Sequence, residues 1–166
     1  MKIVKPVFFA LDKKILLWYH YAGGNMLINR STDYAVRALK YLAEKGKEAS
    51  AAELTRELKI PWPFMRKLMQ LLGKKGFVGS RKGPGGGFTL LKKPEEINLT
   101  DLIRLFQGPV CLNECVFKKK VCPNKSTCFL SEKIGEIQDY ANDVLSKINL
   151  REIIDGGKRD GKKKNN

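Results

Sequence analysis

Apolar positions between residues 31 and 45 follow a helical period, which predicts an amphipathic helix where the regular part of the chain begins. Ser31 or Thr32 is suited to cap the first turn of this helix, and Gly46 is suited to end it. The residues predicted to face inward are Tyr34, Ala35, Ala38, Leu39, Leu42 and Ala43.

Two further helices are predicted directly after the first. Ser50 is placed to cap a short helix over residues 51–59, with Glu53 completing a capping box. After a proline-containing turn, a third helix is predicted over about residues 63–75, with basic and amide side chains on its outer face. Two short helices around a tight turn indicate a helix-turn-helix motif.

Residues 77–91 predict a β-hairpin, because two alternating segments flank the glycine-rich sequence KGPGGG. Glycine supplies the positive φ angles that a tight hairpin tip requires. A phosphate-binding loop is the alternative interpretation of this run. However, the run lacks the Gly-Lys-Ser/Thr ending and lies between strands rather than before a helix. The hairpin is therefore interpreted as the wing of a winged helix-turn-helix.

The second half of the chain predicts three more helices, over residues 97–106, from about Cys128 to Lys147, and over residues 150–154. The long helix carries apolar residues at alternating spacings of four and three, which is the a/d pattern of a coiled coil. These residues are Leu130, Ile134, Ile137, Ala141, Val144 and Ile148. A second copy of the chain fits this seam, because helix-turn-helix proteins usually bind DNA as two-fold dimers; packing onto the same subunit is the alternative.

Composition and charge narrow the function of this mainly α-helical chain. Its 166 residues are 43% hydrophobic and 30% charged, with a formal net charge of +15. Such a chain can bury a core, and its charge indicates a polyanionic partner, nucleic acid before an anionic membrane surface. Residues 26–95 carry a net charge of +9, residues 96–155 of −1 and residues 156–166 of +4. This division predicts a winged helix-turn-helix DNA-binding domain, a cysteine loop with a dimerisation helix, and a disordered basic tail.

Residues 1–25 differ in pattern from the rest of the chain, and we expect them to be a translated leader outside the fold. The peptide AGGNM at its end can be encoded by a nucleotide sequence that contains AGGAGGT shortly before an ATG codon. Because AGGAGGT is a bacterial ribosome-binding site, Met26 is predicted to be the natural start. The single histidine, His20, lies in this leader, so no Cys-His nucleophile is expected after Met26.

The third helix and the hairpin carry the candidate DNA contacts. They are Arg66, Lys67, Gln70, Arg81, Lys82 and Gly83. Arg66 and Lys67 occupy early positions of the third helix, where side chains reach base edges in the major groove. The hairpin residues are expected to approach phosphates or the minor groove. Attraction to phosphates without sequence choice is the alternative for any one of these residues.

All four cysteines, Cys111, Cys115, Cys122 and Cys128, lie within 18 residues. A disulfide framework requires an oxidising compartment, whereas the chain shows no export signal and is expected to be cytoplasmic. Structural zinc usually involves close cysteine pairs, and only Cys111 and Cys115 have that spacing. Thiolates are the normal ligands of iron–sulfur clusters, although no ferredoxin spacing is matched. The spacing therefore favours a metal or a cluster and leaves the choice between zinc and iron open.

From Met26 to about Ile154 the chain resembles the Rrf-two family of bacterial transcription regulators, including its IscR-like and NsrR-like branches. The matching segments are STDYAVRAL, SRKGPGGGFTL, INLTDLIRLFQGP, the cysteine segment, and the long helix with NLREII. The resemblance implies a homodimeric winged-helix regulator, usually a repressor, that binds a palindromic operator in double-stranded DNA and is not an enzyme.

The same resemblance implies that Cys115, Cys122 and Cys128 hold an iron–sulfur cluster of the 2Fe–2S or 4Fe–4S type. Cys111 falls outside the family pattern and is a spare thiol or an alternative ligand. The histidine ligand of the IscR-like branch is missing here, whereas the aspartate ligand of the NsrR-like branch aligns with Asp33 of the partner subunit. A first-turn carboxylate favoured by the helix dipole explains Asp33 equally well.

The cluster implied by the resemblance would sense nitric oxide, redox state or iron–sulfur status. Two alternatives remain open. One is a cluster-free regulator that responds to a small molecule or a partner protein, and the other is a DNA-binding protein stabilised by zinc.

Overall fold

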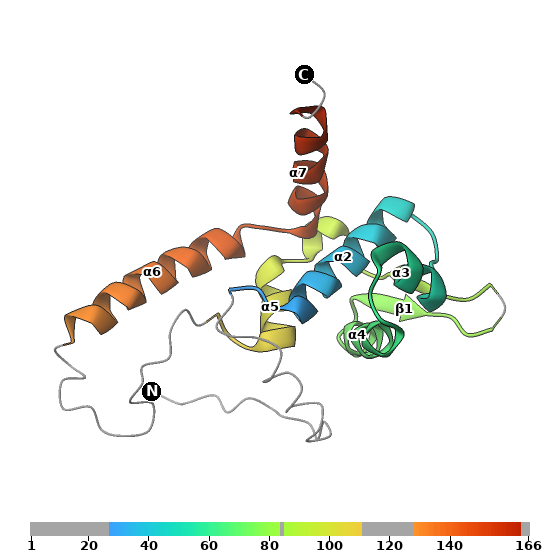
Figure 1. The fold of residues 1–166 in the computed structure, drawn as a ribbon, viewed down its shortest axis with the longest axis horizontal. Coiled ribbons are helices and arrows are strands. Elements are labelled where there is room, and N and C mark those ends of the chain that lie inside the picture. The colour runs from blue at the N-terminus through green and yellow to red at the C-terminus, as the bar shows by residue number, and fades with distance from the viewer. Residues whose placement is uncertain (1–26, 84, 111–127, 164–166) are drawn as a thin grey trace.

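The computed structural model describes residues 27–83, 85–110 and 128–163, the last seven of them as helical backbone only. This part of the chain is mainly helical, with one two-stranded antiparallel hairpin (Figure 1), which confirms the predicted fold class. The elements are α2 (Arg30–Lys45), α3 (Ala51–Leu58), α4 (Trp62–Lys74), β1 (Val78–Ser80), β2 (Phe88–Leu90), the 3-10 helix η1 (Pro94–Glu96), α5 (Leu99–Gln107), α6 (Phe129–Ser146) and α7 (Leu150–Lys163).

Helix α2 lies at the centre of the fold, in contact with α3, α4, β2, α5 and α7. Its N-cap is Asn29, whose side chain accepts a hydrogen bond of 2.9 Å from the Thr32 N–H. The prediction of Ser31 or Thr32 as the cap is therefore wrong: Asn29 already satisfies the first turn, and Thr32 is fully buried within it. At the other end, Gly46 takes the left-handed conformation, as predicted.

Helices α3 and α4 form the predicted helix-turn-helix. Ser50 caps α3 by accepting a hydrogen bond of 3.1 Å from the Glu53 N–H. The helix ends at Leu58. Its C-cap, Lys59, has φ +54° and is the one non-glycine residue with positive φ in the described part of the chain. Helix α4 begins at Trp62, one residue earlier than predicted, because Pro61 at its N-cap already has the required φ of −55°.

Strands β1 and β2 form the predicted hairpin, with Val78 opposite Leu90 and Ser80 opposite Phe88. Both strands are shorter than predicted. The hairpin also has a neighbour that the sequence pattern does not indicate, because Ala49 and Phe88 exchange backbone hydrogen bonds of 3.1 and 2.9 Å. Ala49, two residues before α3, thereby joins the wing to the helix-turn-helix.

The larger of two hydrophobic cores contains residues from both sides of residue 95, where the charge pattern changes. Residues beyond this point that share the core with α2, α3 and α4 are Ile97, Leu102, Phe106, Leu150 and Ile154. Two backbone hydrogen bonds of 2.9 Å also connect the start of α5 with the start of α7. The change in net charge at residue 95 is therefore a property of the surface and does not mark the end of the core. Helices α5 and α7 contribute side chains to the core that supports the helix-turn-helix.

Helix α6 projects away from the rest of the molecule (Figure 1), and its bounds agree with the prediction to within about one residue. Its buried residue is Leu145, near the C-terminal end. Leu145 packs with Leu99, Ile103 and Val110 in a second, smaller core. The body of the protein therefore supports α6 at one end.

Helix α7 continues to Lys163, although the sequence predicts a short helix over residues 150–154 and a disordered tail from residue 156. Cationic side chains suit a helix C-terminus, although the glycines of this stretch, Gly156, Gly157 and Gly161, are poor helix formers. Residues 1–26 lie outside the described part, so the expected leader and the start at Met26 stay predictions. No described helix combines the length and the hydropathy needed to cross a membrane.

Candidate nucleic-acid interface

The outer face of α4 carries exposed polar side chains, as the sequence predicts. Arg66, Lys67 and Gln70 are exposed, and α4 contains no acidic residue. The opposite face is buried through Met65, Leu68, Met69 and Leu72. The helix is therefore anchored by its apolar side and presents positive charge and an amide group to a ligand, without a carboxylate that would repel phosphates.

The tip of the hairpin holds the other candidate contacts. Lys82 and Gly83 are exposed, and Gly83 has φ +97°, which favours glycine. Arg81 is also exposed, but its Nη2 lies 2.5 Å from Glu48 Oε2 and 3.2 Å from the Gly85 carbonyl oxygen. Arg81 therefore braces the hairpin against the segment before α3, and a phosphate would have to compete with Glu48 for it.

Gly87 lets the hairpin approach that same segment closely. A Cβ atom at this position would lie 2.5 Å from the Ala49 carbonyl oxygen and 2.7 Å from its carbon. The sequence predicts that the whole glycine run forms the tight tip of the hairpin. Gly87 instead allows the hairpin to lie close to Ala49, and the position of the wing depends on this contact.

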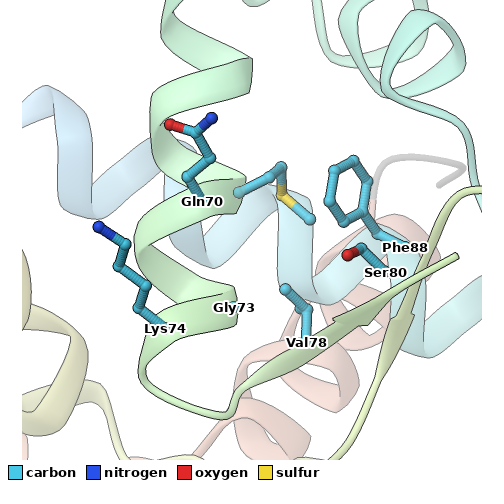
Figure 2. A pocket seen from close by; sticks show the side chains of 7 residues that line it. Gln70, Gly73, Lys74, Val78, Ser80 and Phe88 are labelled. Atoms are coloured by element: carbon cyan, nitrogen blue, oxygen red, sulfur yellow. The ribbon is translucent and has the colours of Figure 1, made fainter. Parts of the chain in front are cut away.

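A shallow pocket of about 430 Å³ lies between α4 and the hairpin (Figure 2). Its lining residues are Met69, Gln70, Gly73, Lys74, Val78, Ser80 and Phe88. Gln70 and Lys74 come from α4, and Ser80 and Phe88 come from the hairpin strands. Of the candidate DNA contacts, this lining includes Gln70 alone.

Glu53 joins α3 to α2 through a hydrogen-bonded cluster. Its carboxylate accepts a hydrogen bond of 2.7 Å from the Tyr41 hydroxyl and pairs with the Lys45 ammonium. Hydrogen bonds from Lys45 and then Tyr41 hold the pKa of Glu53 below its usual value, and the bond to Glu53 raises the pKa of Tyr41. This cluster fixes the first helix of the helix-turn-helix on the central helix.

Asp33, the candidate fourth ligand, lies on the surface in the first turn of α2. Its carboxylate is 3.8 Å from Arg37 Nη1, and its side chain is 56% exposed. Arg37 in turn donates a hydrogen bond of 2.7 Å to the Leu58 carbonyl oxygen. An exposed ion pair at this distance is weak, so the carboxylate is held loosely. Its role as a ligand stays a prediction.

A partly buried polar cluster, which sequence reasoning missed, ties the start of α2 to the end of α5. Gln107 Oε1 accepts a hydrogen bond of 2.8 Å from the Asn29 N–H, and Gln107 Nε2 donates one of 2.9 Å to the Leu27 carbonyl oxygen. The Thr32 hydroxyl lies 3.0 Å from the same Oε1 and 3.1 Å from Asn29 Oδ1. We call this cluster, formed by Gln107, Asn29, Thr32 and Leu27, the Gln107 clasp.

The cysteine segment is described only at its end. Cys128 has a free, half-buried thiol and directly precedes the first residue of α6. Cys111, Cys115 and Cys122 lie outside the described residues. Within the described ranges, no three histidine, cysteine or carboxylate side chains come together as a metal site. The predicted ligand set is thus untested.

Helix α6 exposes three of the six residues of the predicted apolar seam, and the other three are half-buried. Leu130 is 67% exposed, Ile137 58% and Val144 40%. Phe129 and Tyr140 on the same helix are 70% and 71% exposed. A soluble protein rarely leaves so many large apolar side chains together in water. This helix is therefore a candidate contact surface of a different kind from α4.

Comparison with known proteins defines the class. Residues 28–156 match the family model Rrf2, described as an iron-dependent transcriptional regulator. The chain is 32% identical over 132 residues to an HTH-type transcriptional regulator of Aquifex aeolicus (strain VF5), covering 78% of this chain and 92% of the relative. It is 29% identical over 132 residues to the HTH-type transcriptional regulator NsrR of Shouchella clausii (strain KSM-K16), covering 78% and 89%.

A solved structure shows the same fold. The structure of CymR, the global cysteine regulator of B. subtilis, superimposes with a TM-score of 0.62 at 24% identity, covering 77% of this chain and 95% of that one. Fold and relatives together define a winged-helix, DNA-binding transcriptional regulator, not an enzyme. The chain belongs to the Rrf2 family. The resemblance stated from the sequence is thereby confirmed.

Proposed function

We propose that this protein is a homodimeric repressor that binds a palindromic DNA operator through α4 and the hairpin. The observation that carries the proposal is the exposed face of α4, which offers Arg66, Lys67 and Gln70 with no acidic residue among them. A helix of this kind, anchored in a core on its other side, suits the major groove.

The candidate residues take different roles on DNA. Arg66 has the donor geometry to read guanine, and Gln70 has the amide that reads adenine. Lys67 and Lys82 supply positive charge for phosphates, and Gly83 allows close approach of the hairpin backbone. Arg81 acts mainly by bracing the hairpin, because it is already paired with Glu48.

The dimer is proposed to form through α6. The exposed seam of this helix is continuous with the small core around Leu145, so a second α6 would extend an existing apolar contact. A two-fold dimer presents two α4 helices to half-sites separated by one helical turn of DNA, or a multiple of it. The palindromic operator follows from this symmetry.

The proposed cofactor is an iron–sulfur cluster held by Cys115, Cys122 and Cys128, with Asp33 of the partner subunit or Cys111 as fourth ligand. The chemistry of the donor set fits, because thiolates are normal cluster ligands, and the free thiol of Cys128 is half-buried beside α6. The description of the family as iron-dependent supports iron over zinc. Such a cluster would supply a redox-active iron centre that reacts with nitric oxide.

Regulation is proposed to act through the connection between these ligands. Asp33 belongs to α2 of the DNA-binding half, whereas Cys128 directly precedes α6. A cluster bound by both Asp33 and Cys128 would fix the separation of the two α4 helices in the dimer. Loss of the cluster would change this separation and weaken binding to an operator whose half-sites have a fixed spacing. The protein would act in the cytoplasm, where bacterial DNA lies.

DNA binding is tested by the salt dependence of affinity for duplex DNA, measured by fluorescence anisotropy. We expect the logarithm of the binding constant to fall linearly with the logarithm of salt concentration. Replacing both Lys67 and Lys82 with alanine should reduce this slope by about one unit for each phosphate that is no longer neutralised. The matched control is Lys133→Ala on α6, where Lys133 is paired with Glu136. Equal slopes in all three proteins would contradict the proposed interface.

The cofactor is tested by visible absorption with iron, sulfide and zinc analysis of the anaerobically purified chain. We expect broad absorbance with matched iron and sulfide, lost in Cys128→Ala and retained in Cys111→Ala if Cys111 is the spare thiol. Asp33→Ala should change the stability of the cluster and leave the apo-protein folded. Zinc without iron or sulfide would contradict the cluster and favour the zinc-stabilised alternative.

A further inference from the structure

Trp62 is a large apolar side chain exposed in a polar region. It is the first residue of α4 and remains 49% exposed. Most of the other large exposed apolar side chains in the described part belong to α6, where they form a common surface. Trp62 lies instead on the helix that carries Arg66 and Lys67. Burial in the core of its own chain does not explain its position.

The backbone holds Trp62 firmly in this exposed place. Proline occurs on both sides of it, and the Pro61 carbonyl oxygen accepts hydrogen bonds of 3.0 Å from both the Phe64 and Met65 N–H groups. Met65 is completely buried and anchors this first turn in the core. Because the backbone is already ordered, binding a ligand here costs the side-chain entropy of the indole and no backbone entropy.

Trp62 lies on one side of α4 together with two exposed residues of known base preference. Arg66 follows one turn later, and Gln70 one turn after that, and both are exposed. Arginine reads guanine and glutamine reads adenine, while apolar side chains read the C5-methyl group of thymine. Residues near the N-terminus of a recognition helix are the ones that contact base edges.

We propose that Trp62 is a specificity-determining residue whose indole contacts thymine methyl groups in each half-site. The inference rests on the proposed DNA-binding function and adds a base preference to it. The exposed Trp62, Arg66 and Gln70 then form a row along α4 that reads thymine, guanine and adenine. Removing the indole weakens binding where the methyl groups lie and leaves phosphate attraction unchanged.

The test compares thymine with deoxyuridine, which lacks only the C5-methyl group. The probe is a duplex selected by the full-length protein from a random-sequence library, prepared with thymine or with deoxyuridine at every thymine position. Burying one methyl group is worth about fourfold in affinity. We therefore expect the protein to bind the thymine duplex about fourfold more tightly for each methyl group contacted. Trp62→Ala should bind both duplexes equally, and Trp62→Phe should retain part of the preference.

Two controls make the test specific. Leu91→Ala removes another exposed apolar side chain, 63% exposed and close to the hairpin, and should keep the full thymine preference. The chain has two tryptophans, Trp18 and Trp62, so Trp62 reports alone in a Trp18→Phe background. Its fluorescence emission should change when the thymine duplex is added to saturation.

The outcomes separate this inference from the proposed function. If the protein binds the duplex with the expected salt dependence but Trp62→Ala keeps the full thymine preference, the inference is wrong and the proposed function stands. If Trp62 emission is unchanged by saturating DNA, the inference is also wrong, and an indole contact with another protein becomes the better explanation. If the protein has no salt-dependent affinity for duplex DNA, both fail.

Discussion

The hairpin and α6 both extend from the body of the molecule, but the body holds them differently (Figure 1). The hairpin is held from several sides, by its own strand pairing, by the bridge between Ala49 and Phe88, and by the ion pair between Arg81 and Glu48. Helix α6 is held near one end, through Leu145, and exposes apolar side chains along the rest of its length.

This difference follows the chemistry of the two surfaces. The α4 and hairpin surface presents cations and an amide group, so contacts within the same chain must position these groups before a ligand arrives. The α6 surface presents apolar side chains, which gain stability only when another apolar surface covers them. The braced region, which is α4 with the hairpin, is therefore held in place by contacts within one chain. The unbraced region, α6, exposes apolar side chains that the proposed dimer would cover.

The largest expected effect is a loss of self-association, caused by placing a charge on the exposed apolar surface of α6. Ile137→Asp should weaken self-association about 100-fold, because a buried, unpaired carboxylate costs several kcal/mol. The stability of the single subunit should not fall, since Ile137 is 58% exposed within it. Sedimentation velocity over a range of concentrations measures the first effect and urea unfolding the second. Asp139→Lys, an exposed change outside the seam, is the control, and equal association of both variants would contradict the assignment of α6 as the dimer contact.

Substitutions that disturb the contacts of the hairpin should instead change the free energy of unfolding of the single chain. Gly87→Ala forces a Cβ atom into the Ala49 backbone and should lower the free energy of unfolding by about 2 kcal/mol. Gly73→Ala is the matched control, because the nearest atom to its new Cβ is 3.7 Å away and alanine favours a helix by about 0.5–1 kcal/mol. Urea denaturation should therefore show shifts of opposite sign. Shifts of the same sign would mean that the wing tolerates the added methyl group.

A smaller effect is expected at the Gln107 clasp, which braces the start of α2. Gln107→Leu leaves the Asn29 N–H without its acceptor, while the Thr32 hydroxyl keeps Asn29 Oδ1, and should cost about 1–2 kcal/mol in the free energy of unfolding. Gln107→Glu keeps the acceptor and loses only the donor to the Leu27 carbonyl oxygen, so it should cost less. If urea denaturation ranks the two variants in the reverse order, the accepting oxygen is not the important part of the clasp.

The smallest effect is a pH dependence inside the braced region. The pKa of Glu53 is lowered in the folded protein from its ordinary value of 4.5, first by the hydrogen bond from Lys45. The cluster therefore contributes its full stability above about pH 4.5, and this contribution is lost as the pH falls through the lower pKa of the folded state. Glu53→Gln should remove this part of the acid dependence of urea unfolding.

Glu95 provides the comparison for that measurement. Its pKa is also lowered, by Arg151, but both side chains of this pair are about half exposed. Water and salt weaken such a pair, so Glu95→Gln should change the acid dependence less than Glu53→Gln does. Parallel acid profiles for the wild type and Glu53→Gln would show that the cluster does not contribute to stability.

Local patterns predicted the helices, the hairpin and the exposure of the α4 face well, because each depends on the spacing of apolar residues within one element. The cap of α2 was assigned wrongly because Asn29, Ser31 and Thr32 are all good capping residues, and only the course of the chain selects Asn29. The ion pair between Arg81 and Glu48 and the Gln107 clasp were not predicted, since they join residues 33 and 75 or more positions apart. Trp62 was overlooked because a tryptophan next to a helical apolar stripe is normally part of the core.

The single-ended support of α6 has a mechanical consequence. With 18 residues the helix is about 27 Å long, so a shift of 1 Å at its free end corresponds to a rotation of about 2° about its supported end. Cys128 directly precedes the free end of α6, and Leu145 lies in the small core near the other end. A displacement applied at Cys128 therefore acts on α6 through the longest lever arm that this helix offers.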